Sequence, residues 1–161
     1  MLCIIRKNSC NGNAGNYIFS KKVGKCILEH GFDVLLASIP LMQANLSNHI
    51  CPSNSCDVRL IIDNQYYNCK LLYANPKNRN EPCLQFRYDS NPELLRKLKQ
   101  IFQYSYNKII DKNISIKDNY VNCQNTLFRN DLIEEFSIYS TDKKDVFLLK
   151  YSNVYNNKIA A

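Results

Sequence analysis

The sequence predicts a mostly-β fold of the α+β class, a barrel or a sandwich, and three observations indicate it. Three central segments alternate apolar and polar residues, one segment has the spacing of an amphipathic helix, and further strand-like segments follow towards the C-terminus. Many short strands with one well-marked helix do not fit the repeated strand–helix units of a parallel sheet. At 161 residues, the chain is expected to form one domain with a real core.

The N-terminal third has the least regular pattern. Residues 17–42 are expected to form a strand, a short helix and a second strand. Gly31 would end the helix, because glycine readily adopts the left-handed conformation found after helix ends. The second strand would then be residues 32–37.

The central third carries the strongest strand signals. Residues 57–62, 66–73 and 83–88 each place apolar side chains on one face, with period two. Asp63 and Asn64 separate the first two segments, and both residue types tolerate left-handed dihedral angles. A tight hairpin is therefore predicted there.

A helix is predicted after the third of these strands. Ser90 and Glu93 have the spacing of a capping box, and Pro92 suits the first helical turn. Two more strands, residues 133–140 and 146–152, are expected around a polar turn. This completes a fold with many short strands and few helices.

The charge of the chain favours an anionic partner. Lysine and arginine number 21 and aspartate and glutamate 14, so the formal net charge is +7 and the sequence pI is about 9.0. Such an excess attracts phosphate, which makes nucleic acid the leading class of partner, although an ordinary basic protein would show the same balance. No apolar run approaches the ~18 residues of a membrane span, and the N-terminus lacks the charged start of a signal peptide. A cytoplasmic location without a membrane partner is expected.

The eight cysteines are interpreted as packed thiols rather than as ligands. His49, Cys51 and Cys56 are the nearest approach to a metal cluster, but no second pair follows at zinc-site spacing. Cys69 and Cys83 lie inside strand patterns, which favours burial. No metal and no cofactor are therefore expected.

Catalytic signatures are missing from the sequence. It contains no nucleophile-elbow, phosphate-loop or dinucleotide-binding motif. A metal-dependent nuclease is a weak alternative, because Asp142 and Lys144 give one Asp-x-Lys spacing in a turn without metal-binding neighbours. The chain is therefore expected to be a binding module and not an enzyme.

Three segments offer side chains that could read bases or hold phosphates. The first is the polar loop 74–82, the second lies around residues 20–25, and the third is 5–16. The candidate DNA-binding residues are Asn75, Lys77, Asn78, Arg79, Asn80, Ser20, Lys21, Lys22, Lys25, Arg6 and Lys7. Single-strand binders would instead expose aromatic rings on a sheet face, whereas Tyr67, Tyr73 and Tyr88 alternate with core positions.

Residues 57–106 resemble the second half of the B-three-type pseudobarrel DNA-binding domain. The resemblance rests on the order of hairpin, polar basic loop, third strand and capped helix, and on the segment "LLRKLKQIFQYSY". The suspected relative is the N-terminal recognition domain of an McrB-type, LlaJI-like restriction subunit. The long N-terminal extension and the many cysteines depart from that family's pattern.

The resemblance implies an open seven-stranded pseudobarrel with two short flanking helices and two loop arms that grip the major groove. One arm would be residues 75–81, and the other would follow the first strand, at 18–23 or else at 6–16. A short helix near residues 40–50 would be the family's first helix.

The resemblance also implies a domain plan and partners. Residues 17–152 would form the pseudobarrel, 1–16 an extension or the first strand and arm, and 153–161 a tail or linker. A motor domain in the same full-length chain and a separate nuclease subunit would complete a restriction system.

The leading hypothesis is sequence-specific recognition of double-stranded DNA through the major groove. One alternative is a reader of modified bases such as methylcytosine, which would flip a nucleotide into an aromatic pocket. Another is a protein-interaction or assembly domain, which would expose an apolar patch and would not bind DNA.

Overall fold

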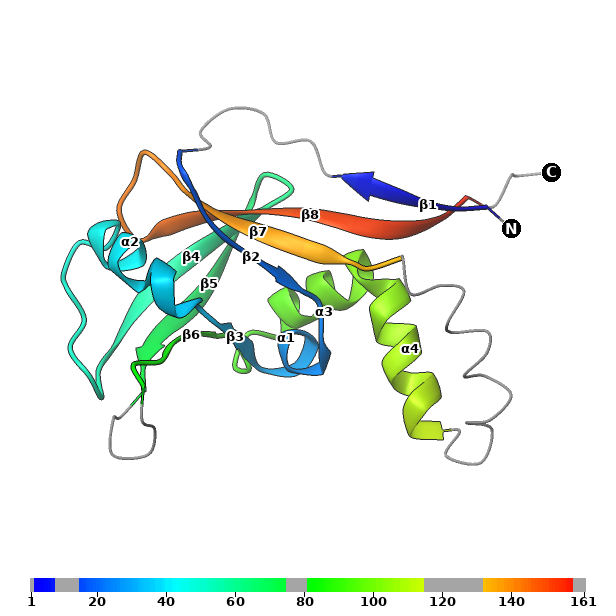
Figure 1. Ribbon diagram of the computed structural model, residues 1–161, viewed down its shortest axis with the longest axis horizontal. Coiled ribbons are helices and arrows are strands. Elements are labelled where there is room, and N and C mark those ends of the chain that lie inside the picture. Colours follow the sequence, from blue (N-terminus) through cyan, green and yellow to red (C-terminus); the bar gives the residue numbers. More distant parts are fainter. Residues whose placement is uncertain (1, 8–14, 75–80, 115–131, 158–161) are drawn as a thin grey trace.

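The computed structural model describes residues 2–7, 15–74, 81–114 and 132–157. Its strands form one curled sheet, and helices α1, α3 and α4 lie together at one side of it (Figure 1). The strands are β1 (Leu2–Lys7), β2 (Tyr17–Lys22), β3 (Gly31–Asp33), β4 (Ser55–Ile62), β5 (Gln65–Tyr73), β6 (Leu84–Arg87), β7 (Glu135–Ser140) and β8 (Val146–Asn157). The helices are α1 (Lys25–Glu29), η1 (Leu36–Ser38, a 3₁₀ turn), α2 (Ile39–Ala44), α3 (Pro92–Ile101) and α4 (Gln103–Ile114).

The sheet is an open half-barrel of seven strands in the order β2-β7-β8-β4-β5-β6-β3. Strands β2 and β3 are its two edges, and they face each other across a gap that we call the seam. The rings of Phe19 and Phe32 meet inside the seam, with centroids 6.2 Å apart. The predicted mostly-β fold with seven strands is confirmed, although the described residues contain more helices than the two expected.

The three central strands form as predicted. β4 and β5 pair over their whole length, and β6 then pairs with β5. Asp63 and Asn64 have φ angles of 50° and 66°, which are the left-handed dihedrals that a two-residue hairpin turn requires. The tight hairpin at this position is confirmed.

The expected order of strand, short helix and strand is found, and helix α1 stops just before Gly31, with His30 as its C-cap. Gly31 does not have the left-handed conformation that the prediction assumed, but begins strand β3. A Cβ atom at this position would lie 1.9 Å from the carbonyl oxygen of Phe86, so only glycine lets β3 approach β6 this closely. The expected strand 32–37 is also wrong beyond Asp33. Strand β6 has four residues and offers no longer partner, so the chain turns into η1 and α2 instead.

Helix α3 begins one residue later than the capping-box prediction placed it. Asn91, rather than Ser90, is the N-cap, and its side-chain oxygen accepts a hydrogen bond of 3.2 Å from the backbone N–H of Leu94. Pro92 occupies the first helical turn as expected. Among the described helices, none combines the length and apolar composition needed to cross a membrane.

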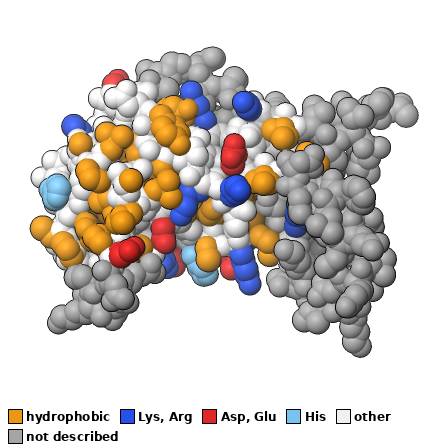
Figure 2. Space-filling view, viewed as in Figure 1, with side chains coloured by type: hydrophobic (Ala, Val, Ile, Leu, Met, Phe, Trp, Pro, Cys, Tyr) orange, Lys and Arg blue, Asp and Glu red, His pale blue; other side chains and the backbone are white. Residues whose placement is uncertain are grey.

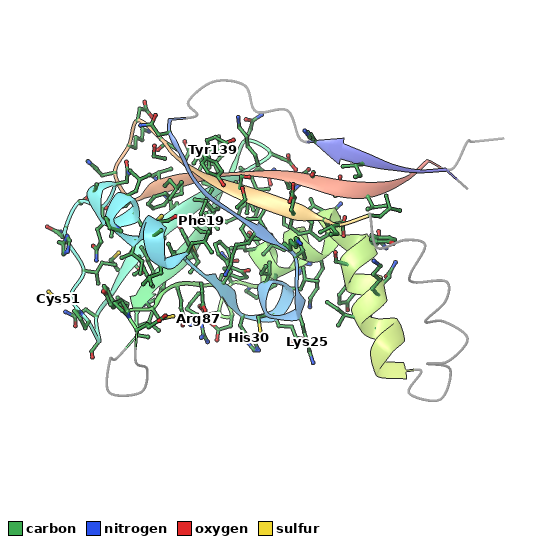
Figure 3. The ribbon with its side chains drawn as sticks, viewed as in Figure 1. Phe19, Lys25, His30, Cys51, Arg87 and Tyr139 are labelled. Atoms are coloured by element: carbon green, nitrogen blue, oxygen red, sulfur yellow. The ribbon has the colours of Figure 1, made fainter. Side chains whose placement is uncertain are left out.

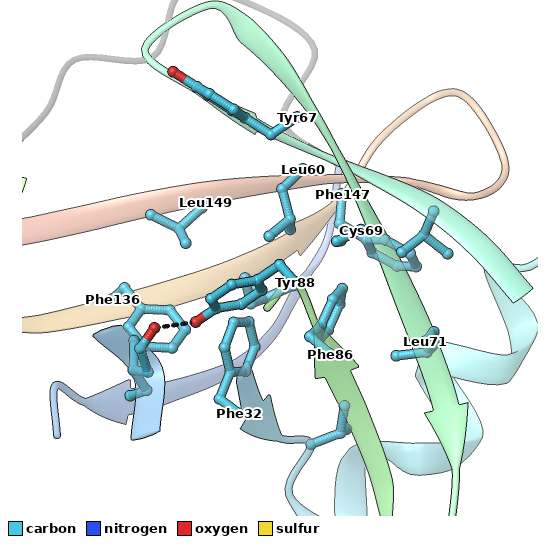
Figure 4. Close-up of a cluster of buried hydrophobic side chains, with 14 of the residues drawn as sticks. Phe32, Leu60, Tyr67, Cys69, Leu71, Phe86, Tyr88, Phe136, Phe147 and Leu149 are labelled. Atoms are coloured by element: carbon cyan, nitrogen blue, oxygen red, sulfur yellow. Dashed lines mark hydrogen bonds between the residues drawn. The ribbon is translucent and has the colours of Figure 1, made fainter. Parts of the chain in front are cut away.

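The core fills the concave side of the half-barrel, where aromatic rings from several strands pack together (Figure 4). Phe32 stacks on Phe86 at 4.8 Å and meets Phe136 edge-on at the same distance. The Tyr88 hydroxyl donates a hydrogen bond to the carbonyl of Ile27, which ties α1 to the end of β6 (Figure 4). Cys69 and Cys83 are buried in or beside these strands, as predicted.

Both ends of the chain add to the sheet. Strand β1 pairs with residues 152–157 of β8, outside the seven-strand path. The tail expected from residue 153 is therefore wrong for residues 153–157, which continue β8. Residues 2–7 form a strand, but one that pairs with β8 and not with β2.

Charged groups, one buried and one pair half-buried, join the helices to the strands at two points. The Glu134 carboxylate accepts hydrogen bonds from the backbone N–H groups of Ser105 in α4 (2.7 Å) and Val154 in β8 (2.9 Å). Burial raises the pKa of Glu134, and the two hydrogen bonds only partly oppose that effect. The carboxylate of Asp63, in the hairpin turn, forms an ion pair with Lys97 Nζ and accepts a hydrogen bond from the Tyr151 hydroxyl, both at 2.9 Å.

Candidate nucleic-acid interface

Strand β6 brings together two segments that lie far apart in the sequence. At its C-terminal end, the N–H of Tyr88 donates to the carbonyl of His30, the last residue before β3. Before its N-terminal end, the carbonyl of Cys83 accepts from the N–H of Ala74, where β5 has just ended. The four residues of β6 lie between Cys83 and Tyr88, and the five steps of extended chain from one to the other span about 17 Å.

Basic side chains gather at the His30 end of this strand. We call Lys25, His30 and Arg87 the basic edge, and Figure 3 shows all three along one border of the molecule. Lys25 is exposed on α1, and no ion pair links it to another described residue. Arg87 forms an exposed ion pair with Asp89 (3.5 Å), and the exposed His30 imidazole lies 3.7 Å from the Glu29 carboxylate. Pairs this long and exposed contribute little to stability, so both side chains can exchange their partners for a phosphate.

A hollow of about 730 Å³ lies at the other end of β6, beside the seam. It is lined by Lys21, Asp33, Val34, Leu35, Leu36, Glu81, Pro82 and Cys83. The structure thus brings Lys21 next to the base of the loop that follows β5. The described lining contains no aromatic side chain, so it does not provide the stacking pocket that a flipped base would need.

The predicted arm at 18–23 is wrong in its local structure, because these residues form strand β2. β2 pairs with β7, which leaves no room for a loop there. Ser20 lies between the Tyr17 hydroxyl (2.9 Å) and the Ser137 hydroxyl (2.6 Å), and Lys22 is exposed opposite Glu135. Strand β2 is the first strand of the half-barrel, and the segment that follows it is 23–30. Of the candidate residues Ser20, Lys21, Lys22 and Lys25, this segment contains Lys25.

The remaining predicted residues do not join the basic edge. Arg6 and Lys7 lie in β1, opposite Asn153 and Ser152 of β8, on the far side of the sheet from β6 (Figure 1). Lys7 is exposed. Asn75, Lys77, Asn78, Arg79 and Asn80 lie outside the described residues, whose chain stops at Ala74 and resumes at Glu81.

His30 and Arg87 were not selected from the sequence. Arg87 points away from the core in the alternation of residues 83–88, which by itself indicates only a solvated side chain. Its position next to His30 depends on the pairing of β3 with β6, for which no local pattern exists. No sequence signal would have joined these two residues.

The described cysteines do not form a metal centre. No three histidine, cysteine or acidic side chains within the described ranges lie close enough to hold an ion. Burial, with smaller contributions from Asp145 and Asp57, raises the pKa of the Cys56 thiol to about 11. Burial raises the pKa of the Cys69 thiol to about 12. Both thiols are therefore protonated at neutral pH and are poor nucleophiles.

An apolar patch lies next to the hollow. Leu35, Leu36 and Leu41 are exposed around η1 and α2, and Figure 2 shows hydrophobic side chains gathered over this part of the molecule. Exposed groups of leucines on this scale can mark a contact surface for another protein.

No family model, no curated protein and no solved structure matches this chain.

Proposed function

We propose that this chain recognises double-stranded DNA, with the basic edge and the loop after β5 on either side of the major groove. The observation that supports this most is the geometry of β6. It holds one polar segment at each end, about 17 Å apart, and the major groove is about 12 Å wide. The two segments could therefore straddle the groove while β6 stays rigid between them.

The charge and the order of elements also support the proposal. The net charge of +7 favours a polyanion. Strand β2, the first strand of the half-barrel, is followed by residues 23–30, which include Lys25. The β4–β5 hairpin is followed by the polar basic loop. The resemblance to pseudobarrel domains implies arms after these two elements, although residues 25–29 of the first segment form helix α1 and not a loop. On that resemblance alone, recognition would serve to target a restriction system with a motor domain and a separate nuclease subunit.

Selection from a random duplex library, followed by titration of the enriched duplex at several salt concentrations, tests the proposal. One enriched motif is expected, with an affinity that falls steeply as salt rises.

Replacing both Lys25 and Arg87 by Ala should weaken binding about tenfold or more and lower the salt slope by about 1 for each phosphate that the protein no longer neutralises. Lys77→Ala or Arg79→Ala should cost about 1–3 kcal/mol and relax specificity at one position if that side chain reads a base.

The matched control is Lys143→Ala, which removes an exposed lysine from the turn between β7 and β8. It should lower affinity far less than the double variant does. The proposal is overturned if no duplex is enriched, or if the control and the double variant weaken binding equally.

The apolar patch around Leu36 favours a second candidate, a protein-interaction or assembly domain. That function does not require the basic edge to bind phosphate. The same titration separates the two candidates, because an assembly domain would show no salt-sensitive binding to any duplex.

A further inference from the structure

The outer face of the sheet carries a continuous row of apolar and aromatic side chains. The strand registers align Tyr17 of β2 with Tyr139 of β7, Leu148 of β8, Ile61 of β4 and Tyr66 of β5. Their chain neighbours Ile138, Leu149, Leu60 and Tyr67 point into the core. Because side chains alternate along a strand, the row lies on the outer face of the sheet across five strands, but Leu148 at its centre is buried and only the ends of the row are open.

The tyrosines at the two ends of this row are open to solvent. Tyr17 is 53% exposed and Tyr66 is 49% exposed. Tyr17 meets Tyr139 edge-on at 5.7 Å, and its hydroxyl bonds to Ser20, so the ring is held in place. Aromatic rings fixed on a sheet face offer flat surfaces on which other rings can stack.

Each end of the row also carries a cation. Lys150 lies 4.6 Å from the ring centroid of Tyr139, and the Arg59 guanidinium lies 4.8 Å from that of Tyr66. Within the described part of the chain, neither cation forms an ion pair. Both cations therefore keep an uncompensated charge, Arg59 beside the exposed ring of Tyr66 and Lys150 beside the half-buried ring of Tyr139, which contacts the exposed Tyr17.

We infer that this outer face binds single-stranded nucleic acid, with bases stacked on Tyr17 and Tyr66 and phosphates held by Lys150 and Arg59. Unpaired bases expose the flat faces that such rings need, whereas a duplex buries them in its own stack. Tyr17 and Tyr66 are four strand spacings apart, about 19 Å, so one strand of several nucleotides can reach both ends. Figure 3 shows Tyr139 on the opposite side of the molecule from Lys25, His30 and Arg87, so this site is separate from the duplex site.

Titration of the full chain with labelled 12-nucleotide oligothymidine and oligouridine, monitored by fluorescence anisotropy, tests this site. Both probes present unpaired bases, and their relative affinities distinguish DNA from RNA as the ligand. Tyr66→Ala should weaken binding roughly 5- to 150-fold, which corresponds to the loss of one stacked base. Tyr66→Phe keeps the ring and should bind as the unmodified chain does. Arg59→Gln should reduce the salt dependence of binding.

Three results would overturn the inference. The first is no binding of either oligonucleotide, and the second is equal binding by the Ala and Phe variants. The third is a dimer in sedimentation that Tyr66→Ala dissociates, because this would assign the face to a second copy of the chain. The Lys25 and Arg87 double variant should bind oligothymidine normally, so failure of this site and failure of the duplex site are distinguishable.

Discussion

Two groups of charged side chains among the described residues have opposite environments. Where the helices meet the strands, Glu134 is 2% exposed and accepts two backbone hydrogen bonds. In the same region Lys97 and Asp63, 21% and 31% exposed, pair at 2.9 Å. At the basic edge, Lys25 is exposed and Arg87 reaches its acidic neighbour only at 3.5 Å.

The difference shows that the number of charges does not identify a binding surface. Lys97 and Arg87 are both cations, but Lys97 already has a close and partly buried partner in Asp63, and separating the two would leave a partly buried carboxylate without its cation. Arg87 can leave its exposed partner at little cost. Charges of the first region are therefore expected to control stability, and charges of the basic edge to control affinity.

The largest effect is expected at Glu134. Glu134→Ala removes the acceptor for two backbone N–H groups, those of Ser105 and Val154, and should lower the free energy of unfolding by about 3 kcal/mol. Denaturant unfolding followed by circular dichroism measures this change. Glu135→Ala is the matched control, because the neighbouring carboxylate is exposed, and its effect should stay within about 0.5 kcal/mol. Equal losses in both variants would break the distinction between the two regions.

The sequence predicted those parts of the fold in which local pattern and final burial agree. Residues 57–62 and 66–73 alternate because one face of β4 and β5 packs on the core, and the Asp63–Asn64 turn follows from the dihedrals these residues tolerate. The helix after Asn91 also follows from local signals. Its start was misplaced by one residue because Ser90 and Asn91 are both good caps.

Features that depend on distant pairing could not be predicted. Gly31 was correctly placed directly after a short helix, but its close approach to Phe86 was missed, because that contact exists only in the folded sheet. Ser20 and Lys21 were assigned to a loop for the same reason, since β7 pairs with them from more than a hundred residues away. The basic edge could not be predicted for the same reason, because His30 comes next to Arg87 only through the pairing of β3 with β6.

A smaller loss is expected at Lys97. Lys97→Met keeps most of the aliphatic stem but removes the ion pair with Asp63, so the free energy of unfolding should fall by about 1 kcal/mol. Duplex affinity should fall no more than in a variant that loses an equivalent exposed cation, because Lys97 already has its partner within the protein. Arg96→Met is the control: Arg96 is exposed on the same helix, and its replacement should change stability by no more than about 0.5 kcal/mol. A loss of duplex affinity in Lys97→Met alone would show that this cation also contacts DNA.

The smallest effect is expected at Asp89, and its sign is opposite to that of the other changes. Asp89→Asn removes the acidic neighbour of Arg87, so the guanidinium no longer gives up an ion pair when it meets a phosphate. Duplex affinity should rise about two- to threefold, while stability changes by less than about 0.5 kcal/mol, because exposed pairs of this kind contribute only a few tenths of a kcal/mol to about 1 kcal/mol. Titration of the enriched duplex at low salt measures the gain.

Any substitution that removes a negative charge strengthens binding to a polyanion slightly, so a control for net charge is needed. Asp142→Asn makes the same change at an exposed turn position between β7 and β8, distant in sequence and structure from Arg87. If Asp89→Asn gains clearly more than Asp142→Asn, the effect is local and Arg87 contacts the duplex. If both gain equally, the basic edge contributes only through the overall charge of the protein, and the contact with DNA must lie elsewhere.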